Sequence, residues 1–475
     1  MATIHVVLCG GFGKRLWPIS RAQYPKPFIP LQNDETLFNL TLNRNTKHCD
    51  KRMIVTNVAH AALAQGACYN CDSGKQRETL FLLEGIAKNT ATSVTLAALA
   101  ADPEDILWVT PADHWIADNQ RYSDELSYAI DIAQDNALLT IGITPDSPNT
   151  QYGYIQRGKP YKQQQDIHCY KVEKFHEKPN KKTAQHYLTS GQYFWNSGMF
   201  CFKAGVFLNE LQQHAPQLLK GAKSLHQHVS KKENCWQYTA DKMQALQAVS
   251  IDVAVMEKSQ NLMMLASKID WRDLGQFEQL QHLTETDQYG NSKGQNIYVQ
   301  DAQNNYIYSQ DRYVAAVGVS ELIIADTPDA LLVSKRGCSA GIQTLVTKKS
   351  EKNPELFNES PVEKRPWGSF RVIKNESSIK VKEITVQPGK RLSLQKHQHR
   401  KEHWVVIAGD ATVQVEQQTQ QLSVGQSIDI PLGAIHRLSN QGSAPVKIIE
   451  VQFGDYLGED DIERLEDDYK RTISD

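Results

Sequence analysis

The sequence lacks the features of three common classes of protein. No part of its 475 residues is apolar over the length that a membrane-spanning helix needs, which argues against an integral membrane protein. The formal net charge of −2 provides no general basic surface, so neither nucleic acid nor a membrane is expected as a partner. The first residues enter a strand-like run directly, without the charged segment and cleavage site of a secretory signal, and a cytoplasmic location is expected.

Cysteine is sparse and forms no recognisable metal or disulfide pattern. The eight cysteines are scattered along the chain, and the one C-x-x-C pair, Cys68 and Cys71, has no second pair at the spacing of a zinc site. We interpret this pair as incidental, and a reducing compartment fits best. At this length the chain is expected to fold as two or three domains, each with its own core.

The spacing of apolar residues changes along the chain and divides it into parts. Residues 1–285 alternate short apolar runs with helical patterns, which predicts an α/β domain with a largely parallel sheet. Residues 286–347 consist of short alternating segments and are typical of a β-rich module. Residues 348–365 are polar and predict a linker that could be mobile. Residues 366–475 contain many short strands, as in a small antiparallel barrel or jelly roll, and their last segment, 458–471, has helical spacing.

A glycine-rich turn follows the first predicted strand and could bind a phosphate in several ways. A Rossmann fingerprint fails because Leu16 stands where its third glycine belongs. A Walker loop fails because Leu8 stands where its first glycine belongs and Arg15 where its hydroxyl belongs. The backbone N–H groups of such a turn can still bind an anion that basic side chains neutralise, although a plain surface turn is the alternative. The residues concerned are Gly10, Gly11, Gly13, Lys14, Arg15 and Lys26.

Acidic residues far apart in the sequence are candidates for a magnesium site. Asp113 follows an apolar strand and would lie at the carboxyl edge of the sheet, where open α/β folds bind their ligands. Asp270 and Asp273 lie beside another glycine turn. Two carboxylates on one Mg²⁺ would suit phosphoryl or nucleotidyl transfer, because the metal offsets charge on the reacting phosphates. Each aspartate could instead be a turn or cap residue.

Further polar residues stand where a sugar phosphate could bind. Glu177 and Lys178 precede a proline that fixes the turn, and the compact charge of a lysine there could hold a phosphate. Asn196 interrupts an otherwise apolar strand, where its amide needs hydrogen-bonding partners that sugar hydroxyls could supply.

Taken in order, these motifs resemble those of sugar-phosphate nucleotidyltransferases over roughly the first 350 residues. Trp17 and the segments IAKNTATSVTLAALA and SIDVAVMEKS make the resemblance specific to mannose-1-phosphate guanylyltransferases. Two positions depart from the family pattern, since Pro27 stands where glutamine is common and His176 where a small apolar residue is usual. The motifs are GGFGKRLWP at 10–18, Pro25-Lys26, PADH at 111–114, YGYI at 152–155, FHEKP at 175–179 and NSGMF at 196–200.

This resemblance implies a modified Rossmann-like, mixed sheet and an in-line attack of mannose 1-phosphate on the α-phosphorus of GTP, with release of pyrophosphate. No general base is required, because a phosphate monoester is already ionised, and catalysis would depend on positioning and charge neutralisation. Asp113 and Asp273 would hold Mg²⁺. The implied catalytic set is Arg15, Lys26, Asp113, Lys178 and Asp273; the nucleotide-binding set is Gly10, Gly11, Gly13, Lys14, Arg15, Asn89 and Thr90; and the sugar-phosphate-binding set is Gly153, Glu177, Lys178 and Asn196.

Closely spaced histidines lie near the start of the C-terminal part. In a strand, Gln395, His397 and His399 would share one face, because side chains alternate. The spacing within residues 389–409 and 425–440 resembles the two cupin motifs, with glutamine in place of the first histidine. The resemblance implies one divalent metal, such as Zn²⁺ or Co²⁺, with Mn²⁺ and Fe²⁺ also compatible. Its ligands would be Gln395, His397, Glu402 and His436.

The segments RPWGSF, QKHQHRKEHW and GEDDIERLEDDYKR extend the resemblance, over the whole chain, to bifunctional type II mannose-6-phosphate isomerase/mannose-1-phosphate guanylyltransferases. It implies a C-terminal cupin that interconverts fructose 6-phosphate and mannose 6-phosphate through a cis-enediol. A metal would polarise substrate oxygens, and an acid–base group would move a proton between C1 and C2. His399 and Lys401 are assigned to that step and His403 stays an alternative, while Arg400 or Arg471 could bind the substrate phosphate.

The leading hypothesis is therefore a two-activity enzyme of GDP-mannose and polysaccharide biosynthesis. One alternative keeps the guanylyltransferase and makes the cupin catalytically silent or a sugar-phosphate sensor. Another is a regulatory subunit that binds a nucleotide sugar without turnover. The expected partners are GTP, mannose 1-phosphate and hexose 6-phosphates, and strand edges of the β-rich module could pair between chains to form a homo-oligomer.

Overall fold

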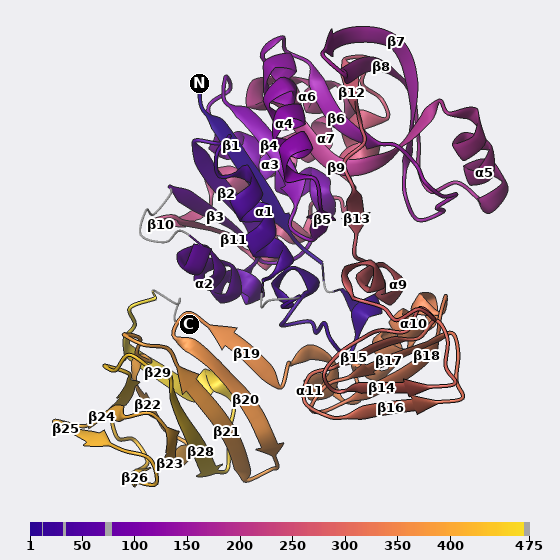
Figure 1. Ribbon diagram of the computed structural model, residues 1–475. Coiled ribbons are helices and arrows are strands. Elements are labelled where there is room, and N and C mark those ends of the chain that lie inside the picture. The colour runs from indigo at the N-terminus through magenta and orange to yellow at the C-terminus, as the bar shows by residue number, and fades with distance from the viewer. Residues whose placement is uncertain (12, 32–34, 72–77, 470–475) are drawn as a thin grey trace. The chain divides into compact units, whose positions relative to one another are not determined.

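The computed structural model describes residues 1–11, 13–31, 35–71 and 78–469, and the chain forms two compact units (Figure 1). The first unit comprises the N-terminal strand and the described residues of 25–64 and 71–283. The second comprises the described residues from 284 onward and two stretches of the N-terminal half, 13–24 and 65–70. Within these described ranges, no helix has the length and apolar character needed to span a membrane.

An eleven-stranded mixed sheet organises the first unit, in the order β10-β11-β3-β2-β1-β4-β9-β6-β12-β8-β7. The half from β11 to β4 is parallel, whereas β9 runs antiparallel to both β4 and β6. The alternating pattern therefore predicts the α/β class correctly. The expected largely parallel sheet is instead mixed, because β9 lies antiparallel to its neighbours and the edge strands β7, β8 and β10 also pair antiparallel. The strands are β1 (Thr3–Cys9), β2 (Lys51–Asn57), β3 (Thr79–Glu84), β4 (Ile106–Pro111), β6 (Leu138–Ile143), β7 (Tyr154–Gln164), β8 (Ile167–His176), β9 (Tyr193–Lys203), β10 (Ser230–Lys232), β11 (Cys235–Tyr238) and β12 (Leu262–Ser267), with β5 (His114–Ile116) and β13 (Trp271–Asp273) as a separate pair.

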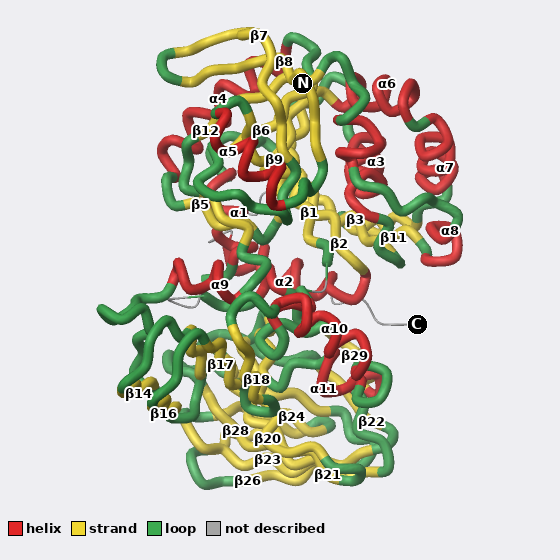
Figure 2. The backbone as a smooth tube through the Cα atoms, turned by 90° about the vertical axis from the view of Figure 1, so that its right-hand side faces the viewer, coloured by secondary structure: helices red, strands yellow, loops and turns green. Residues whose placement is uncertain are grey.

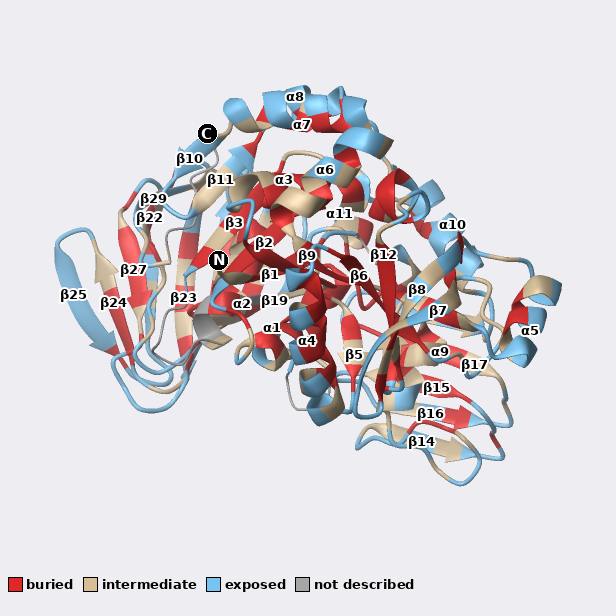
Figure 3. Ribbon diagram, turned by 90° about the horizontal axis from the view of Figure 1, so that it is seen from above, coloured by how far each residue is buried: buried red, intermediate tan, exposed pale blue. Residues whose placement is uncertain are grey.

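Helices cover both faces of this sheet. Along β4, Leu107 and Val109 contribute to a core with α3, α6 and α7, while Trp108 contributes to a second core with α4 (Figure 2). The central strands are thus buried on both faces, as Figure 3 shows, and this explains their continuous apolar runs. The helices are α1 (Leu37–Asn45), α2 (Ala61–Cys71), α3 (Asn89–Ala100), α4 (Asn119–Gln134), α5 (Lys181–Ser190), α6 (Ala204–His214), α7 (Pro216–Gln227), α8 (Ala240–Gln244) and α9 (Phe277–Leu280), with short helical turns η1 (Lys14–Leu16), η2 (Lys26–Phe28), η4 (Val58–His60), η5 (Asp252–Met256) and η6 (Gln281–Leu283).

Short strands that pair in parallel at a constant sequence separation form the first part of the second unit. β14 (Ile297–Gln300) pairs with β16 (Val314–Val317), and β15 (Tyr306–Ser309) pairs with β17 (Leu322–Asp326), to which β18 (Leu331–Lys335) adds antiparallel. Inside these coils the Asn305 amide donates to Val319 O at 3.0 Å and its Oδ1 accepts from Leu322 N at 2.9 Å. The β-rich module expected here is therefore a stack of coils, and the buried side-chain amide of Asn305 links one coil to the next.

Two antiparallel sheets form the C-terminal part of the second unit, in agreement with the expected barrel or jelly roll. Their orders are β19-β20-β21-β28-β23-β26 and β25-β24-β27-β22-β29. Trp367, Phe370, Trp404, Leu438 and Ile448 are buried in their common core. The strands are β19 (Val362–Arg365), β20 (Gly368–Asn375), β21 (Ile379–Val386), β22 (Leu394–His397), β23 (Arg400–Ala408), β24 (Ala411–Val415), β25 (Gln418–Leu422), β26 (Ser427–Ile430), β27 (His436–Ser439), β28 (Val446–Gly454) and β29 (Ile462–Glu466), with the turn η7 (Glu459–Asp461).

The helical expectation for segment 458–471 is wrong for its described part. Residues Ile462–Glu466 form strand β29, which pairs antiparallel with β22, so that Ile462 lies opposite His397. Pairing supplies hydrogen-bond partners for the backbone of β22, and this long-range requirement outweighs the local spacing of apolar residues.

The polar stretch 348–365, expected as a linker, contains regular structure. The helix α10 (Ser339–Lys349) ends in it, α11 (Pro354–Asn358) follows, and β19 completes it. Phe357 of α11 is buried, which gives this otherwise polar segment a packed residue.

Replacing Phe207 should test the core under α3, α6 and α7. Its side chain is fully buried, so Phe207→Ala should lower the free energy of unfolding by about 3–5 kcal/mol. Urea denaturation followed by circular dichroism measures the change, with the exposed Val253→Ala as the control. A transition midpoint equal to that of the control would contradict this placement of Phe207.

Candidate functional site

Lys26, Asp113 and Asp273 form a charged cluster at one edge of the first unit. Asp113 follows the end of β4, and Asp273 is brought to it because β13 pairs antiparallel with β5, with Asp273 opposite His114. Lys26 is the first residue of η2, and its Nζ lies 2.8 Å from Asp113 Oδ2 and 2.9 Å from Asp273 Oδ1. Two acids that are far apart in the sequence therefore meet at one ammonium group.

Electrostatics keep Lys26 of this cluster charged. Burial lowers the pKa of Lys26, but the charges of Asp113 and Asp273 outweigh it and raise the pKa above the ordinary value. The Lys26 side chain is only 6% exposed, whereas the two aspartate side chains are 31% and 37% exposed and remain accessible to a ligand. Carboxylate oxygens are the ligands that Mg²⁺ prefers, so the donor set of Asp113 and Asp273 fits this ion.

The nucleotide-binding candidates of the first unit lie at two turns. Gly10 and Gly11 follow β1, and an added Cβ at either would meet no atom within 4 Å, which leaves this backbone open to a ligand. Gly11 has φ +98°, a conformation that side chains disfavour. At the start of α3, Asn89 Oδ1 accepts from Thr90 N at 2.8 Å. The hydroxyl of Thr90 accepts from Ile251 N at 2.9 Å, so Thr90 also holds a neighbouring segment.

The remaining nucleotide candidates belong to the second unit. Gly13 has φ +56° and caps the short turn η1, which contains Lys14 and Arg15. Lys14 is exposed. Arg15 is half-buried, and its Nε donates a hydrogen bond to Gln343 Oε1 at 3.1 Å. Arg15 thus has a protein partner on α10.

The residues expected to bind the sugar phosphate lie together in the first unit. Asn196 N donates to Gly153 O at 2.8 Å, which joins β9 to the turn before β7. A Cβ at Gly153 would lie 3.0 Å from Glu177 Oε2, so glycine leaves room for that carboxylate. Lys178 donates from Nζ to Glu177 Oε1 at 2.5 Å, and its side chain is 59% exposed. The structure therefore brings Gly153, Glu177, Lys178 and Asn196 into one neighbourhood.

Asp252 is a member of this neighbourhood that the sequence-based assignment missed. Asn196 Nδ2 donates to Asp252 Oδ1 at 2.9 Å, while Asn196 Oδ1 accepts from Thr140 Oγ1 at 3.3 Å and from Gly198 N at 3.2 Å. Burial and the charge of Glu177 raise the pKa of Asp252 to about 6. The amide in the apolar strand thus has protein partners. Its acidic partner could have been noticed in SIDVAVMEKS, a motif to which no residue role had been assigned.

Three of the four expected cupin ligands form a compact cluster in the second unit. The possible ligand atoms of His397, Glu402 and His436 all lie within 4.8 Å of one another. His397 Nε2 is 3.1 Å from Glu402 Oε1, and His436 Nε2 is 3.7 Å from Glu402 Oε2. Gln395 pairs with His436 across β22 and β27, and its Oε1 accepts from the Ser393 hydroxyl at 2.8 Å.

The bonding of these buried nitrogens fits a metal. Glu402 oxygens lie 3.1 Å from His397 Nε2 and 3.7 Å from His436 Nε2. Among the described residues, however, neither ring nitrogen of His397 nor Nε2 of His436 makes a hydrogen bond of good geometry. Buried polar atoms without partners are rare, because leaving them unsatisfied costs free energy. Burial lowers the pKa of His436, which favours the neutral imidazole that ligates metals. Two imidazoles and a carboxylate suit Zn²⁺ or Co²⁺, so the donor set fits the expected ion.

A shell of buried groups behind Glu402 was not predicted from the sequence. Trp404 Nε1 donates to Glu402 Oε2 at 3.0 Å and Arg400 Nε to Oε1 at 3.1 Å, which orients the carboxylate. Gln452 Nε2 donates to Glu450 Oε1 at 2.7 Å. Burial and the charge of Glu402 raise the pKa of Glu450 to about 8. The sequence did contain a signal for these groups, because Glu450 and Gln452 stand at alternate positions of the otherwise apolar segment VKIIEVQFG and therefore share one face of the strand.

His399 does not share the face of Gln395 and His397, contrary to expectation. Strand β22 ends at His397, so the alternation of side chains does not extend to position 399. The His399 side chain is 53% exposed, and its Nδ1 lies 3.6 Å from Asp455 Oδ1.

Lys401 and His403 alternate with Glu402 along β23 and therefore point to its other face. Lys401 is exposed, and His403 Nδ1 is hydrogen-bonded to Asp429 Oδ1 at 2.8 Å. Neither side chain joins the ligand cluster. Arg471, the other phosphate candidate, lies outside the described residues.

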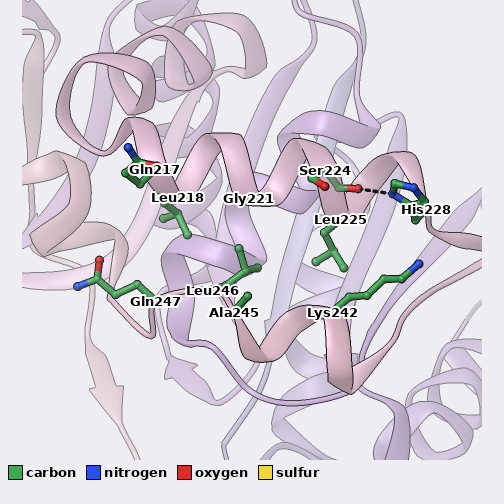
Figure 4. A pocket seen from close by; sticks show the side chains of 10 residues that line it. All are labelled: Gln217, Leu218, Gly221, Ser224, Leu225, His228, Lys242, Ala245, Leu246 and Gln247. Atoms are coloured by element: carbon green, nitrogen blue, oxygen red, sulfur yellow. Dashed lines mark hydrogen bonds between the residues drawn. The ribbon is translucent and has the colours of Figure 1, made fainter.

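A separate pocket of about 410 Å³ lies between α7 and α8 (Figure 4). His228 Nδ1 donates to Ser224 O at 2.8 Å on its rim, and Leu218, Leu225 and Leu246 line it. Its lining contains none of the site residues predicted from the sequence, so this pocket does not mark the predicted site.

Comparisons with known proteins agree with this arrangement. Residues 4–289 match the nucleotidyl transferase family, residues 294–348 the MannoseP isomerase/GMP-like beta-helix domain, and residues 353–467 the mannose-6-phosphate isomerase C-terminal family. The mannose-1-phosphate guanylyltransferase 2 of Escherichia coli O157:H7 is 38% identical over 477 residues, which cover 98% of each chain.

Solved structures also match. The mannose-1-phosphate geranyltransferase from Thermus thermophilus has a TM-score of 0.62 and 28% identity, over 73% of this chain and 99% of that one. The mannose-6-phosphate isomerase from Helicobacter pylori has a TM-score of 0.51 and 36% identity, over 57% of this chain and 100% of that one.

Glu84 leads to a prediction of pH-dependent stability. It is buried at the end of β3, where Ser93 Oγ donates to its Oε1 at 2.8 Å, and burial raises its pKa from 4.5 to about 7 despite this hydrogen bond. Between these two values the unfolded chain releases the proton and the folded chain keeps it, so the folded state loses stability as the pH rises. Glu84→Gln should be more stable than the wild type at pH 8 by on the order of 2 kcal/mol and equal to it at pH 4.

Urea denaturation of both proteins at the two pH values measures this difference. A stability difference between wild type and Glu84→Gln that is the same at both pH values would contradict the raised pKa.

Proposed function

The chain belongs to the nucleotidyl transferase family and carries a mannose-6-phosphate isomerase C-terminal domain, and we propose that it converts GTP and mannose 1-phosphate into GDP-mannose and diphosphate. The convergence of Asp113 and Asp273 on Lys26 carries this proposal, because it combines two metal-binding carboxylates with a buried cation. Such a combination suits a reaction in which charge on phosphates must be neutralised.

In this reaction, the chain's residues position the substrates and neutralise their charge. Asp113 and Asp273 hold Mg²⁺, which when bound offsets charge on the triphosphate. Asp113 and Asp273 keep Lys26 cationic, and its ammonium group attracts the phosphate oxygens of the nucleotide to the site. The open backbone of Gly10 and Gly11 donates N–H groups to the nucleotide. No residue has to remove a proton, because the attacking phosphate oxygen of mannose 1-phosphate is already ionised.

The sugar phosphate binds on the side formed by β7 and β9. Glu177 and Asn196 hydrogen-bond mannose hydroxyls, and Gly153 leaves the space in which the ring lies. Lys178, with its exposed ammonium, neutralises the phosphate of mannose 1-phosphate. The pairing of Asn196 with Asp252 holds the amide in place, so its orientation is set before the sugar binds.

Asp113→Asn tests the transfer reaction. The amide keeps the shape of the side chain but removes one of the two charged metal ligands, so diphosphate release from GTP and mannose 1-phosphate should fall at least about 100-fold. Binding of mannose 1-phosphate, measured by calorimetry, should change little. The matched control is Asp146→Asn, which neutralises an exposed acid paired with Arg272 in the same unit. Full activity of Asp113→Asn would refute the metal assignment, and a wild type that makes no GDP-mannose would refute the function.

We further propose that the C-terminal part interconverts fructose 6-phosphate and mannose 6-phosphate. The unsatisfied ring nitrogens of His397 and His436 carry this proposal, together with Glu402 between them. These side chains and Gln395 hold a divalent cation, which when bound polarises the oxygens on C1 and C2 of the substrate. Trp404 and Arg400 fix the carboxylate of Glu402 through hydrogen bonds to its two oxygens.

The two proposed reactions are not consecutive. The isomerase product carries its phosphate on C6, whereas the transferase takes a sugar with phosphate on C1. A reaction that moves the phosphate between these carbons must act between them.

His436→Ala in the full chain tests the isomerase. Because a buried ligand is lost, bound metal measured by atomic absorption and the isomerase rate should both fall about 10-fold or more, while GDP-mannose synthesis stays within about twofold of the wild type. The matched control is His403→Ala, whose histidine lies on the other face of β23 and bonds to Asp429. A metal-loaded wild type that fails to interconvert the hexose phosphates would show a silent or sensing domain instead.

A further inference from the structure

The loop that carries Lys14 and Arg15 is anchored by parts of the chain far from it in sequence. Residues 13–24 connect β1 to η2, yet they belong to the second unit rather than to the sheet that precedes and follows them. The segment between the β-rich module and the C-terminal sheets, including α11, supplies many of the partners. The loop expected to bind phosphate is thus held in part by a stretch that the sequence alone assigns to a linker.

Arg21 is the centre of this anchor, and its side chain is 0% exposed. Its guanidinium forms a bidentate ion pair with Asp329, with Nη2 2.8 Å from Oδ1 and Nη1 3.1 Å from Oδ2. Nε donates to Pro18 O at 2.7 Å, which ties the side chain to its own loop. Nη1 also donates to the carbonyl oxygens of Leu356 and Glu359. The planar fork of arginine matches such a set of acceptors, whereas a lysine could not bind all of them.

Aromatic packing and backbone bonds add to the same anchor. The ring of Trp17 stacks on Phe357 of α11, with centroids 5.0 Å apart and planes inclined by 27°. Trp17 Nε1 donates to Leu356 O at 3.4 Å, and Gln23 N donates to Asn358 O at 2.8 Å. The loop is therefore fastened to α11 on both sides of Arg21.

Internal bonds carry the effect of this anchor to the start of the loop. Ser20 Oγ donates to Gly13 O at 2.5 Å, and Leu16 N donates to the same carbonyl at 2.9 Å, so the loop closes on the residue before η1. Arg15 is in turn held by Gln343 on α10. Lys14 and Arg15 thus stand on a turn whose two ends are both restrained.

We propose that Arg21 is a positioning residue for nucleotide binding, and that α11 is functionally part of the guanylyltransferase. Ordering a loop on binding costs conformational free energy, and a loop already held in one arrangement binds its ligand more tightly. The C-terminal side of the β-rich module thereby contributes to GTP affinity without touching the nucleotide. This inference rests on the proposed guanylyltransferase activity.

Full-chain variants on the partner side of the anchor test the inference. Asp329→Asn keeps the size of the side chain but removes the charge that Arg21 pairs with, and Phe357→Ala removes the ring under Trp17. Each should raise the KM for GTP about 10-fold, as expected for the loss of one charge-assisted hydrogen bond or one stacked ring. The KM for mannose 1-phosphate and the isomerase rate should stay within about twofold of the wild type. The matched control is Asp311→Asn, which breaks the exposed ion pair with Arg371 in the same unit.

The split between the two substrates separates positioning from general stability. A KM for GTP within twofold of the wild type in folded Asp329→Asn and Phe357→Ala would overturn the inference while leaving the guanylyltransferase intact. A parallel rise in both KM values with loss of isomerase activity would also overturn it, because that pattern indicates damaged folding. If Asp329→Asn does not fold, the KM values and the isomerase rate of Phe357→Ala test the inference in the same way. A wild type without GDP-mannose synthesis would instead be a failure of the proposed function.

Discussion

The pairing of one buried ammonium with two carboxylates is the interaction on which the first unit's site depends. Lys26 Nζ lies within hydrogen-bond distance of both Asp113 and Asp273, and these acids come from distant segments that the β5–β13 pairing brings together. Without the lysine, two carboxylates this close would repel each other and the strand pair would lose stability. The same charges that hold the segments together therefore lie where the proposed cation and polyphosphate would bind.

In the C-terminal sheets, a second set of buried polar groups from different strands also meets at one place. His397 and His436 flank Glu402, and Trp404 and Arg400 fix the carboxylate from behind. All of these residues come from strands of the second unit, so the cluster is complete within that unit. The proposed isomerase site therefore needs no residue of the mixed sheet, in keeping with two reactions that are not consecutive.

The anchor of Arg21 changes how the polar stretch before the C-terminal sheets is understood. Its charged residues and prolines are typical of a linker, but Phe357 and the carbonyl groups of Leu356 and Glu359 receive Trp17 and Arg21. The composition of a segment indicates how much apolar surface it can bury. In this segment one aromatic ring and a few backbone carbonyl groups are enough to bind the loop that contains Trp17 and Arg21. A short helix can thus matter to a distant loop through the acceptors of its backbone, which no side-chain pattern reveals.

The sequence by itself determined the α/β class of the first part, the β-rich module and the strand-rich C-terminal part. The candidate site residues came from the resemblance of its motifs to a known family, and their roles stay predictions. Apolar periodicity and glycine spacing are local properties of the chain, so they can be recognised without the tertiary structure. Only the tertiary structure decided that β9 runs antiparallel, that residues 462–466 form a strand, and that His399 and Lys401 lie outside the ligand cluster. It also decided which side chains are the partners of Asp252, Glu450 and Arg21. These features depend on pairing between distant segments and on where a strand ends, and neither is encoded in the spacing of neighbouring residues.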